Sequence, residues 1–375
     1  MKLAYLANVR FPSERAHSVQ IAHMCQAFAE KRCTVDLYVN KREHKILDSV
    51  INTYGFKSKF EVTRLFPSYI FPNLKFTFYI SEFIFTLHFL LNRKKKYDVI
   101  YSRSEWIIFF LSFFCSSRRL VWESHEAKLN VVARYILFQR KIKCVVISEG
   151  IKDEYLQIKV EPDQLCVAHD AVDSSFFSPS LPNKQSVRTR LGLQNGIKNV
   201  MYIGGLDTWK GVGVFCEAST KLENINFVII GGTLSQLEVY KNKYPNIQFL
   251  GQLPYKDLPA NQQAADILII PNTATNLLSS KYTSPLKLFA HATSGIPLVI
   301  SNVRSLTVVV NELVSTFRPD DPDDLVSVID SVFENYDYCK LQALQLQRLA
   351  TDFTWDARAK KILNFIENKP SVGVG

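Results

Sequence analysis

A glycine-rich turn that ends in a lysine is the segment whose residue types most directly suggest phosphate chemistry. Residues 202–211 read Tyr-Ile-Gly-Gly-Leu-Asp-Thr-Trp-Lys-Gly and directly follow an apolar run. Gly204 and Gly205 would let backbone N–H groups approach an anion, and Lys210 would add a full positive charge against a diphosphate. The segment is neither a Rossmann dinucleotide fingerprint nor a Walker A loop. A structural turn with a surface lysine accounts for it equally well.

Two later segments could complete an anion site. Gly232 is the second of a glycine pair that ends an apolar run, and such a turn lets a ribose or base approach. Ser284 and Pro285 open a helical apolar pattern that we expect to end before Gly295, as an N-cap with proline in the first turn. The free N–H groups at 284–287 would then hold a phosphate. A well-capped core helix without a ligand is the alternative.

Short apolar runs alternate with helix-forming segments along the chain, which indicates doubly wound α/β sheets with right-handed crossovers. A Ser- and Pro-rich segment at 173–182 reads as a linker between two such sheets. The sequence therefore predicts two Rossmann-like parallel-sheet domains facing across a cleft, with ligands at the carboxyl edges of the strands. The predicted strands are 3–7, 35–39, 99–101, 120–122, 145–147, 166–168, 200–203, 227–230, 248–250, 267–270 and 298–300.

The composition is that of a globular protein from a reducing compartment. The chain of 375 residues, 47% of them hydrophobic, is too long for one ordinary core. The seven cysteines form no Cys-x-x-Cys pair, which argues against a disulfide framework and a zinc site. We expect no signal peptide, because the apolar start at 3–7 is short and runs into Arg10 without a small-residue cleavage pattern. We expect no transmembrane helix, because the apolar stretch 69–91 is interrupted by Pro72, Lys75 and Glu82. These features predict a cytoplasmic location.

The net charge of +10 is concentrated in the first half of the chain. Residues 1–170 contain 26 Lys and Arg against 17 Asp and Glu, which leaves a net charge of only +1 for the remainder. The run Arg-Lys-Lys-Lys at 93–96 directly follows an aromatic-rich stretch, a combination that suits an anionic membrane surface. A solvated helix end beside a core helix is the alternative. The charge forms no recognisable nucleic-acid module, so we expect no nucleic-acid partner.

The order of motifs in the second half resembles the sugar-nucleotide domain of family-4 retaining glycosyltransferases, which belong to glycosyltransferase group 1 and have the GT-B fold. That family has a strand followed by Gly-x-Leu and Lys-Gly, then an apolar strand ending in Gly-Gly. A strand followed by Gly-x-Leu/Val-Pro comes next, then an Ala-Asp strand ending in Pro, and last a helix followed by Gly-x-Pro-Val/Leu-Val. The matching segments here are 204–211, 227–232, 249–254, 265–271 and 295–299. Five elements in one order make the resemblance specific.

The first half is similar to the family more loosely, so that the resemblance covers essentially the whole chain. Residues 8–20 stand where many members have an acceptor loop, and 123–126 match a strand-end Glu-x-His-Glu/Asp motif. Segment 170–177 looks like the family's hinge. The resemblance therefore implies an acceptor-binding domain at 1–170, a nucleotide-sugar-binding domain at 171–354, and a C-terminal helix at 355–375 that crosses back to the first domain.

The resemblance also implies a set of site residues. His125 and Lys210 would be catalytic: His125 would contact the donor sugar or the acceptor hydroxyl, and Lys210 would meet the charge of the departing diphosphate. Arg15, His17 and Glu126 would bind the acceptor. The nucleotide sugar would be bound by Gly204, Gly205, Lys210, Gly232, Leu253, Tyr282, Thr283, Ser284, Pro285, Leu286, Lys287 and Ala290.

Two departures from the family pattern concern the donor site. The family usually has two glutamates eight positions apart on the sugar-nucleotide helix, where this chain has Tyr282 and Ala290. The second glutamate normally holds the ribose hydroxyls, and losing such a contact costs about 1.5–3 kcal/mol of affinity. Many members also have an arginine at the position of Gly205, so Lys210 would act here with Lys287 and backbone amides instead.

The reaction implied by the resemblance is transfer of a sugar from a nucleotide-diphosphate sugar, with retained anomeric configuration and with no metal or other cofactor. UDP is the first expectation for the nucleotide and GDP the second. The acceptor would be a glycan or a lipid-linked acceptor in envelope polysaccharide synthesis, on the inner face of the cell membrane. A non-catalytic GT-B protein that binds a nucleotide or a glycan is the main alternative, motivated by Ala290 and Gly205. A sugar-nucleotide epimerase on the same fold is the third.

Overall fold

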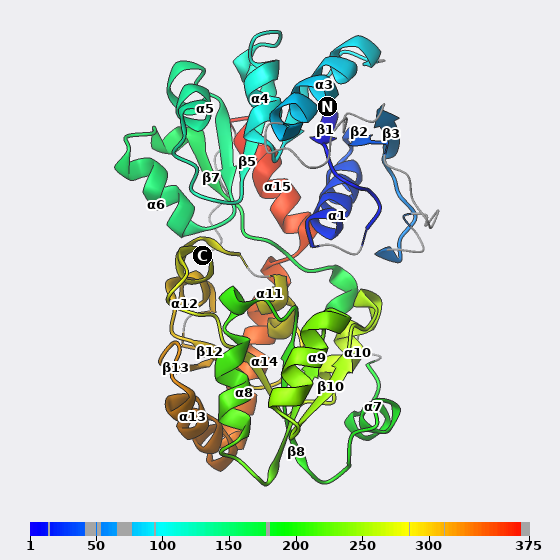
Figure 1. Ribbon diagram of the computed structural model, residues 1–375. Coiled ribbons are helices and arrows are strands. Elements are labelled where there is room, and N and C mark those ends of the chain that lie inside the picture. Colours follow the sequence, from blue (N-terminus) through cyan, green and yellow to red (C-terminus); the bar gives the residue numbers. More distant parts are fainter. Residues whose placement is uncertain are drawn as a thin grey trace. The chain divides into compact units, whose positions relative to one another are not determined.

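The chain forms two compact units (Figure 1). Our computed structural model describes residues 1–13, 16–41, 50, 54–65, 77–93, 95–177, 181–284, 286–310 and 312–368. Unit 1 comprises Met1–His169 and Trp355–Gly375, and unit 2 comprises Asp170–Thr354. The polypeptide thus leaves unit 1 after His169 and returns to it at Trp355.

Unit 1 is built on a 7-stranded parallel sheet with the strand order β3-β2-β1-β4-β5-β6-β7. The chain starts in the middle of this sheet, builds one half outward, and returns to β4 to build the other half. Its elements are β1 (Lys2–Ala7), α1 (Ala16–Glu30), β2 (Thr34–Asn40), β3 (Glu61–Leu65), α3 (Thr77–Asn92), β4 (Val99–Ser102), α4 (Glu105–Leu111), β5 (Leu120–Ser124), α5 (Val131–Arg134), β6 (Lys143–Val146), α6 (Glu149–Gln157), β7 (Leu165–Val167) and α15 (Trp355–Ile366).

Unit 2 repeats this plan with a 6-stranded parallel sheet in the order β10-β9-β8-β11-β12-β13. Its elements are α7 (Lys184–Arg190), β8 (Lys198–Ile203), η5 (Thr208–Lys210), α8 (Val212–Ser219), β9 (Ile225–Ile230), α9 (Leu234–Lys243), β10 (Ile247–Gly251), α10 (Leu258–Gln262), β11 (Ile267–Ile270), η7 (Leu278–Tyr282), α11 (Leu286–Ala292), β12 (Leu298–Ser301), α12 (Arg304–Val310), β13 (Ser315–Phe317), α13 (Pro322–Glu334) and α14 (Tyr336–Leu349). The prediction of two Rossmann-like parallel-sheet domains is confirmed.

The alternation of buried residues along each strand explains why helices cover both faces of each sheet. In β8, Met201 belongs to one apolar cluster and Tyr202 to another. The first cluster includes Leu288 of α11, and the second includes Phe215 of α8. Strands buried on both faces are typical of parallel sheets. Each unit therefore exposes the ends of its strands rather than a sheet face.

Two strands at sheet edges, β3 and β13, were absent from the expectation. β3 has the sequence Glu-Val-Thr-Arg-Leu and buries only Leu65, and β13 is three residues long. Neither has the continuous apolar run that marks a central parallel strand. Within the described part of the chain, no helix is both long and apolar enough to cross a bilayer.

Candidate functional site

The strand order of unit 2 places its switch point between β8 and β11, the two central strands from which the chain builds in opposite directions. Ligands of open α/β sheets bind at the carboxyl ends of strands beside such a point. Three predicted donor residues follow strand ends on one side of it: Gly204 after β8, Gly232 after β9 and Leu253 after β10. The turn 204–211 therefore leaves the sheet at the place where the fold itself favours a ligand.

Close backbone packing requires glycine at two positions of this edge. A Cβ atom on Gly231 would lie 2.2 Å from the carbonyl oxygen of Gly204, and one on Gly211 would lie 1.8 Å from the carbonyl oxygen of Pro271. Gly211 also has a φ of +71°, which favours glycine. The turn after β8 is thus pressed against the ends of both β9 and β11. This packing fixes the position of Lys210, which directly precedes Gly211.

Two lysine ammonium groups converge on the glycine pair of this turn. A methyl group on Gly205 would lie 2.7 Å from Lys210 Nζ, and one on Gly204 would lie 3.7 Å from Lys287 Nζ. Lys210 comes from the turn itself and Lys287 from the first turn of α11. The Asp207 carboxylate accepts a hydrogen bond from Lys210 at 2.7 Å and is itself half-exposed. Two lysine side chains therefore lie beside one small backbone turn.

The ammonium of Lys287 lies in surroundings that disfavour its charge. Burial and, to a smaller extent, repulsion by Lys210 lower the pKa of Lys287 to about 7, although Asp207 opposes the shift. The ammonium lies 4.7 Å from the centroid of the Tyr202 ring and 3.4 Å from the Tyr202 hydroxyl. No ion pair joins Lys287 to a carboxylate among the residues that the structure describes. A bound anion would relieve the repulsion between the two lysines.

Tyr202 is a residue of this candidate site that sequence reasoning missed. It is fully buried near the end of β8, and its hydroxyl donates a hydrogen bond of 2.6 Å to the carbonyl of Gly205. The hydroxyl thus holds the glycine turn in place, and the face of the ring contacts the Lys287 ammonium. An aromatic residue two positions before the glycine pair was the available signal, but a strand interior is where apolar core residues are expected.

The segment before α11 contains several of the predicted donor residues. Tyr282 closes the separate helical turn η7, Thr283 is extended, and the described part of α11 starts at Leu286. The Ser284 hydroxyl accepts a hydrogen bond of 2.8 Å from the backbone N–H of Asp170. Pro285 lies outside the described residues, so the helix cap at Ser284 stays a prediction. The role of the 284–287 amides in holding a phosphate remains a prediction.

Ala290 lies in an apolar environment. Its side chain is 1% exposed and belongs to a cluster with Val172, Phe176 and Phe289. Its backbone carbonyl accepts a hydrogen bond of 3.0 Å from the side-chain amide of Gln262. The small side chain therefore fits a packed core position, whereas a carboxylate there would be surrounded by apolar groups.

In unit 1, His125 belongs to a network centred on the buried carboxylate of Glu123. Glu123 accepts hydrogen bonds from His125 Nε2 at 2.6 Å and from the Gln20 amide at 2.6 Å. Tyr101 donates to its second oxygen, and Arg358 of α15 lies 3.3 Å from the same oxygen. Burial alone would raise the pKa of Glu123, but Arg358 and His125 outweigh burial and hold it well below its usual range. Glu123 is therefore a buried, fully partnered anion.

The partners of His125 define its protonation state. Arg103 Nη2 lies 3.0 Å from His125 Nδ1, and since a guanidinium can only donate, Nδ1 must accept. The ring proton is then on Nε2, which donates to Glu123. Burial lowers the pKa of His125 to about 4, and Arg103 adds to the shift while Glu123 opposes it. His125 is thus a neutral imidazole near pH 7, with both ring nitrogens engaged inside the unit.

Of the three predicted acceptor residues, the structure describes His17 and Glu126. Arg15 lies outside the described residues. The His17 carbonyl accepts a hydrogen bond of 3.3 Å from Arg103, which ties α1 to the same network as His125. Glu126 is exposed, and its carbonyl accepts from the Ser124 hydroxyl at 2.7 Å. The binding roles of all three remain predictions.

A second polar cluster at the carboxyl edge of this sheet was not anticipated. Glu82 of α3 is buried, and its carboxylate accepts from the Asn8 amide at 2.9 Å and from the Ser104 hydroxyl at 2.6 Å. Burial raises the pKa of Glu82 to about 7, although these hydrogen bonds oppose the shift. Asn8 follows β1 and Ser104 follows β4, the two strands at the switch point of unit 1. In the sequence, Glu82 only interrupted an apolar stretch, so nothing indicated a site residue.

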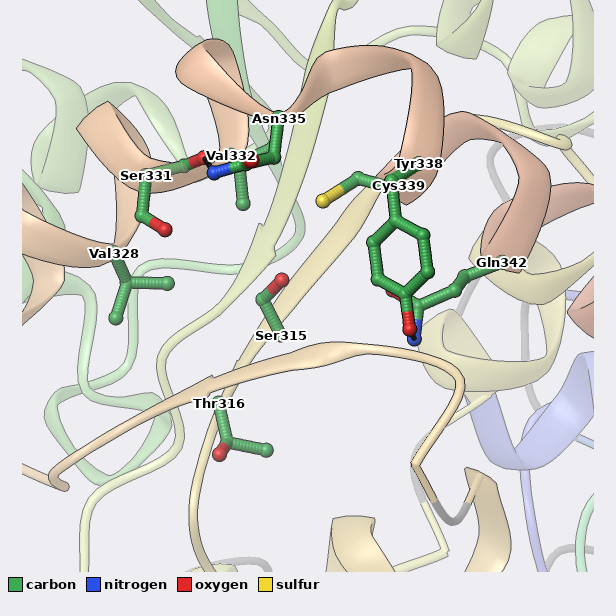
Figure 2. A pocket seen from close by; sticks show the side chains of 9 residues that line it. All are labelled: Ser315, Thr316, Val328, Ser331, Val332, Asn335, Tyr338, Cys339 and Gln342. Carbon is green, nitrogen blue, oxygen red and sulfur yellow. Dashed lines mark hydrogen bonds between the residues drawn. The ribbon is translucent and has the colours of Figure 1, made fainter.

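A separate pocket in unit 2 contains none of the predicted residues. It has a volume of about 410 Å³ and lies between edge strand β13 and helices α13 and α14, as Figure 2 shows. Its walls carry the Cys339 thiol, the Tyr338 ring, and hydroxyl and amide groups, but no charged side chain. Among the described residues, no group of three or more His, Cys, Asp or Glu could hold a metal ion. The charged side chains that lie close together are thus those at the carboxyl ends of β8 and β5, whereas the lining of this pocket is uncharged.

Comparison with known proteins relates part of unit 2 to a known family. Residues 197–335 match the family model described as glycosyl transferases group 1. All the predicted donor residues lie within this matched segment. Across the whole chain, both units together have the GT-B fold, as the following likenesses to solved structures show.

Three proteins are similar over most of the chain. An uncharacterized glycosyltransferase of Methanocaldococcus jannaschii is 21% identical over 257 residues, an alignment that covers 64% of each protein and so less than two thirds of that relative. Sucrose-phosphate synthase from Thermosynechococcus elongatus is 15% identical, with a TM-score of 0.78 and 98% of both chains covered. HepE from Anabaena, solved in complex with UDP-glucose, is 17% identical, with a TM-score of 0.71, covering 98% of this chain and 100% of HepE.

Proposed function

We propose that this protein is a glycosyltransferase that takes a sugar from a nucleotide-diphosphate sugar, with UDP as the first candidate nucleotide and GDP as the second. The observation that carries the proposal is the convergence of Lys210 and Lys287 on the Gly204–Gly205 turn at the switch point of unit 2. Two ammonium groups that repel each other favour a doubly charged ligand, and a glycine turn leaves room for it. The group 1 family match over 197–335 and the UDP-glucose complex of HepE support this choice of ligand.

The proposed role of the lysines is to stabilise the departing nucleoside diphosphate. As the glycosyl bond breaks, negative charge grows on the leaving phosphate oxygen, and a preformed cation lowers the barrier because it interacts more strongly with the transition state. Lys210 is paired with Asp207, which the diphosphate would displace. Lys287, with a pKa of about 7, would become fully protonated when the anion binds. The chemistry proposed here needs no metal ion and proceeds with retention of configuration, as the family resemblance implies.

Unit 1 is proposed to bind the acceptor, a glycan or a lipid-linked acceptor of envelope polysaccharide synthesis. His125 is neutral there, and both of its nitrogens are occupied by Glu123 and Arg103. We therefore assign His125 to binding and orientation rather than to proton abstraction. Its ring edge can contact a sugar while the two nitrogens keep the ring fixed.

A non-catalytic nucleotide-binding protein is the second candidate, because Ala290 is packed in an apolar cluster where the family usually has a ribose-binding glutamate. Two measurements separate the candidates. Thermal unfolding with millimolar UDP, GDP, ADP and CMP tests binding, since ligand at 100 times its dissociation constant adds about 2.7 kcal/mol to stability. Release of UDP from UDP-glucose and other UDP-sugars, with acceptors extracted from bacterial envelopes, tests turnover.

The outcomes of these measurements are distinct. Binding of one nucleotide with turnover and a product of retained configuration supports the proposed transferase. Binding without turnover favours the non-catalytic protein, and an epimerised sugar nucleotide formed without acceptor would indicate an epimerase. If no nucleotide shifts the unfolding midpoint, the proposed donor site is wrong.

A further inference from the structure

The outer face of α3 and the segment around α4 carry an unusual concentration of exposed apolar side chains. Along α3, the exposed residues Tyr79, Phe83, Leu87 and Leu91 follow each other at intervals of four and therefore form one stripe. Just after α4, Phe113 and Phe114 are 59% and 64% exposed. Contiguous exposed apolar surface of this kind marks an interaction site rather than ordinary surface.

Aromatic contacts join these residues into one surface. The Tyr79 and Trp106 rings lie 4.5 Å apart, and the Phe83 and Phe110 rings 5.2 Å apart, so α3 and α4 present their rings side by side. Figure 1 shows the two helices next to each other in unit 1. The surface continues beyond α4 through the Phe113 ring, which stacks on the Tyr135 ring at 5.9 Å. We call this surface, made of α3, α4 and residues 113–114, the aromatic face.

The net charge around the aromatic face is positive. Residues 77–119 contain seven Lys and Arg against three Asp and Glu. Of the acidic residues, Glu82 and Glu105 are buried, and Glu105 is paired with Lys128 at 2.8 Å. Exposed basic residues stand at both of its ends, Arg93 and Lys96 after α3 and Arg118 after Phe114. A second copy of the chain would set these like charges against one another across a two-fold axis.

From these observations we propose that the aromatic face is a lipid-binding surface that lies in the interface of an anionic membrane. Aromatic side chains partition into the headgroup region, and basic residues at its rim attract anionic lipids. The face begins at the carboxyl edge of the sheet, since the same turn of α3 that exposes Tyr79 and Phe83 directs Glu82 to Asn8 and Ser104. A membrane on this face would bring a lipid-linked molecule to that edge. This inference does not depend on the donor site of unit 2.

The test is co-sedimentation of the full chain with phosphatidylcholine vesicles, with and without phosphatidylglycerol. We expect binding to the mixed vesicles that weakens at 1 M salt, where the Debye length falls to about 3 Å. Changing Arg93→Gln and Lys96→Gln together should lower partitioning roughly 25-fold, at about fivefold for each charge near an anionic surface. The triple variant Leu91→Ser, Phe113→Ser, Phe114→Ser should abolish binding even at low salt.

Matched controls keep the result interpretable. Leu234→Ser and Val239→Ser change equally exposed apolar residues of α9 in unit 2 and should leave vesicle binding unchanged. The unfolding midpoint and UDP binding of the triple variant should match those of the unchanged chain, which separates loss of lipid binding from loss of fold or of donor binding. The proposal is overturned if the chain ignores both kinds of vesicle, or if the triple variant still binds. It is also overturned if light scattering shows a dimer that the triple variant dissociates.

Discussion

The two units share one topology but treat charge differently at the carboxyl edges of their sheets. In unit 1, the buried carboxylate of Glu123 has partners from four other residues, and its pKa lies well below the usual range. In unit 2, Lys210 and Lys287 repel one another, and the pKa of Lys287 is lowered to about 7. A fully satisfied buried polar network rigidifies a fold, whereas repulsion between two like charges can be relieved by a ligand of opposite charge. The comparison is therefore consistent with a structural anion in unit 1 and is the physical reason for proposing a ligand site in unit 2.

Removing the anion of unit 1 should have the largest effect on stability. Glu123→Gln leaves Arg358 buried beside a neutral amide, and breaking such a buried pair costs about 3–5 kcal/mol. Chemical denaturation followed by a unit-1 probe, such as the fluorescence of buried Trp122, measures the loss. Glu126→Gln is the control, since Glu126 is exposed and its replacement should change stability by less than about 0.5 kcal/mol. Equal effects of the two changes would show that Glu123 is not the centre of the network.

A carboxylate introduced into unit 2 should find no comparable partners. Ala290→Glu puts a longer, charged side chain among Val172, Phe176 and Phe289, and overpacking alone costs about 1–3 kcal/mol. Thermal unfolding without ligand measures the effect, with Leu234→Glu on the exposed face of α9 as the control. A variant that keeps its stability and binds UDP more tightly would mean that the side chain at 290 faces the ribose. The packing account of Ala290 would then be wrong.

Neutralising either lysine should weaken nucleotide binding without weakening the fold. A hydrogen bond between charged groups contributes about 1.5–3 kcal/mol, so Lys210→Ala and Lys287→Met should each raise the Kd for UDP roughly 10- to 100-fold. Calorimetric titration gives the constants. Lys243→Ala, which removes an exposed lysine paired with Glu217, should change the Kd by less than about twofold. Unchanged affinity in both site variants would remove the basis of the proposed donor site.

The smallest effect is expected at Asp207, which competes with the diphosphate for Lys210. Asp207→Asn removes that competing charge from a half-exposed ion pair, so UDP should bind about two- to fivefold more tightly, in line with the modest energies of exposed pairs. Asp337→Asn, at an exposed position of α14, serves as the control. Weaker binding in the Asp207 variant would indicate that this carboxylate positions Lys210 for the ligand instead.

The central strands and the glycine turns could be predicted from sequence because their signals are local. A continuous apolar run marks β11, and the glycine pair marks the end of β8. Edge strand β3 lacked such a run, and the hydrogen bond from the Asp170 N–H to the Ser284 hydroxyl joins two positions that no local pattern connects. Long-range partners gave no sequence signal: Arg103 meets His125, and Glu82 meets Asn8, only through the order of strands in the sheet.

Proton uptake on UDP binding tests the central claim most directly. At pH 8 Lys287 is mostly neutral, and the phosphate of UDP, with a pKa of about 6, is already ionised. A bound diphosphate should raise the pKa of Lys287, so the complex should take up a proton as it forms. Titration calorimetry at pH 8 in two buffers of different ionisation enthalpy measures this uptake. We predict uptake of most of one proton per UDP, absent in Lys287→Met; binding without proton uptake in the unchanged chain would contradict the account.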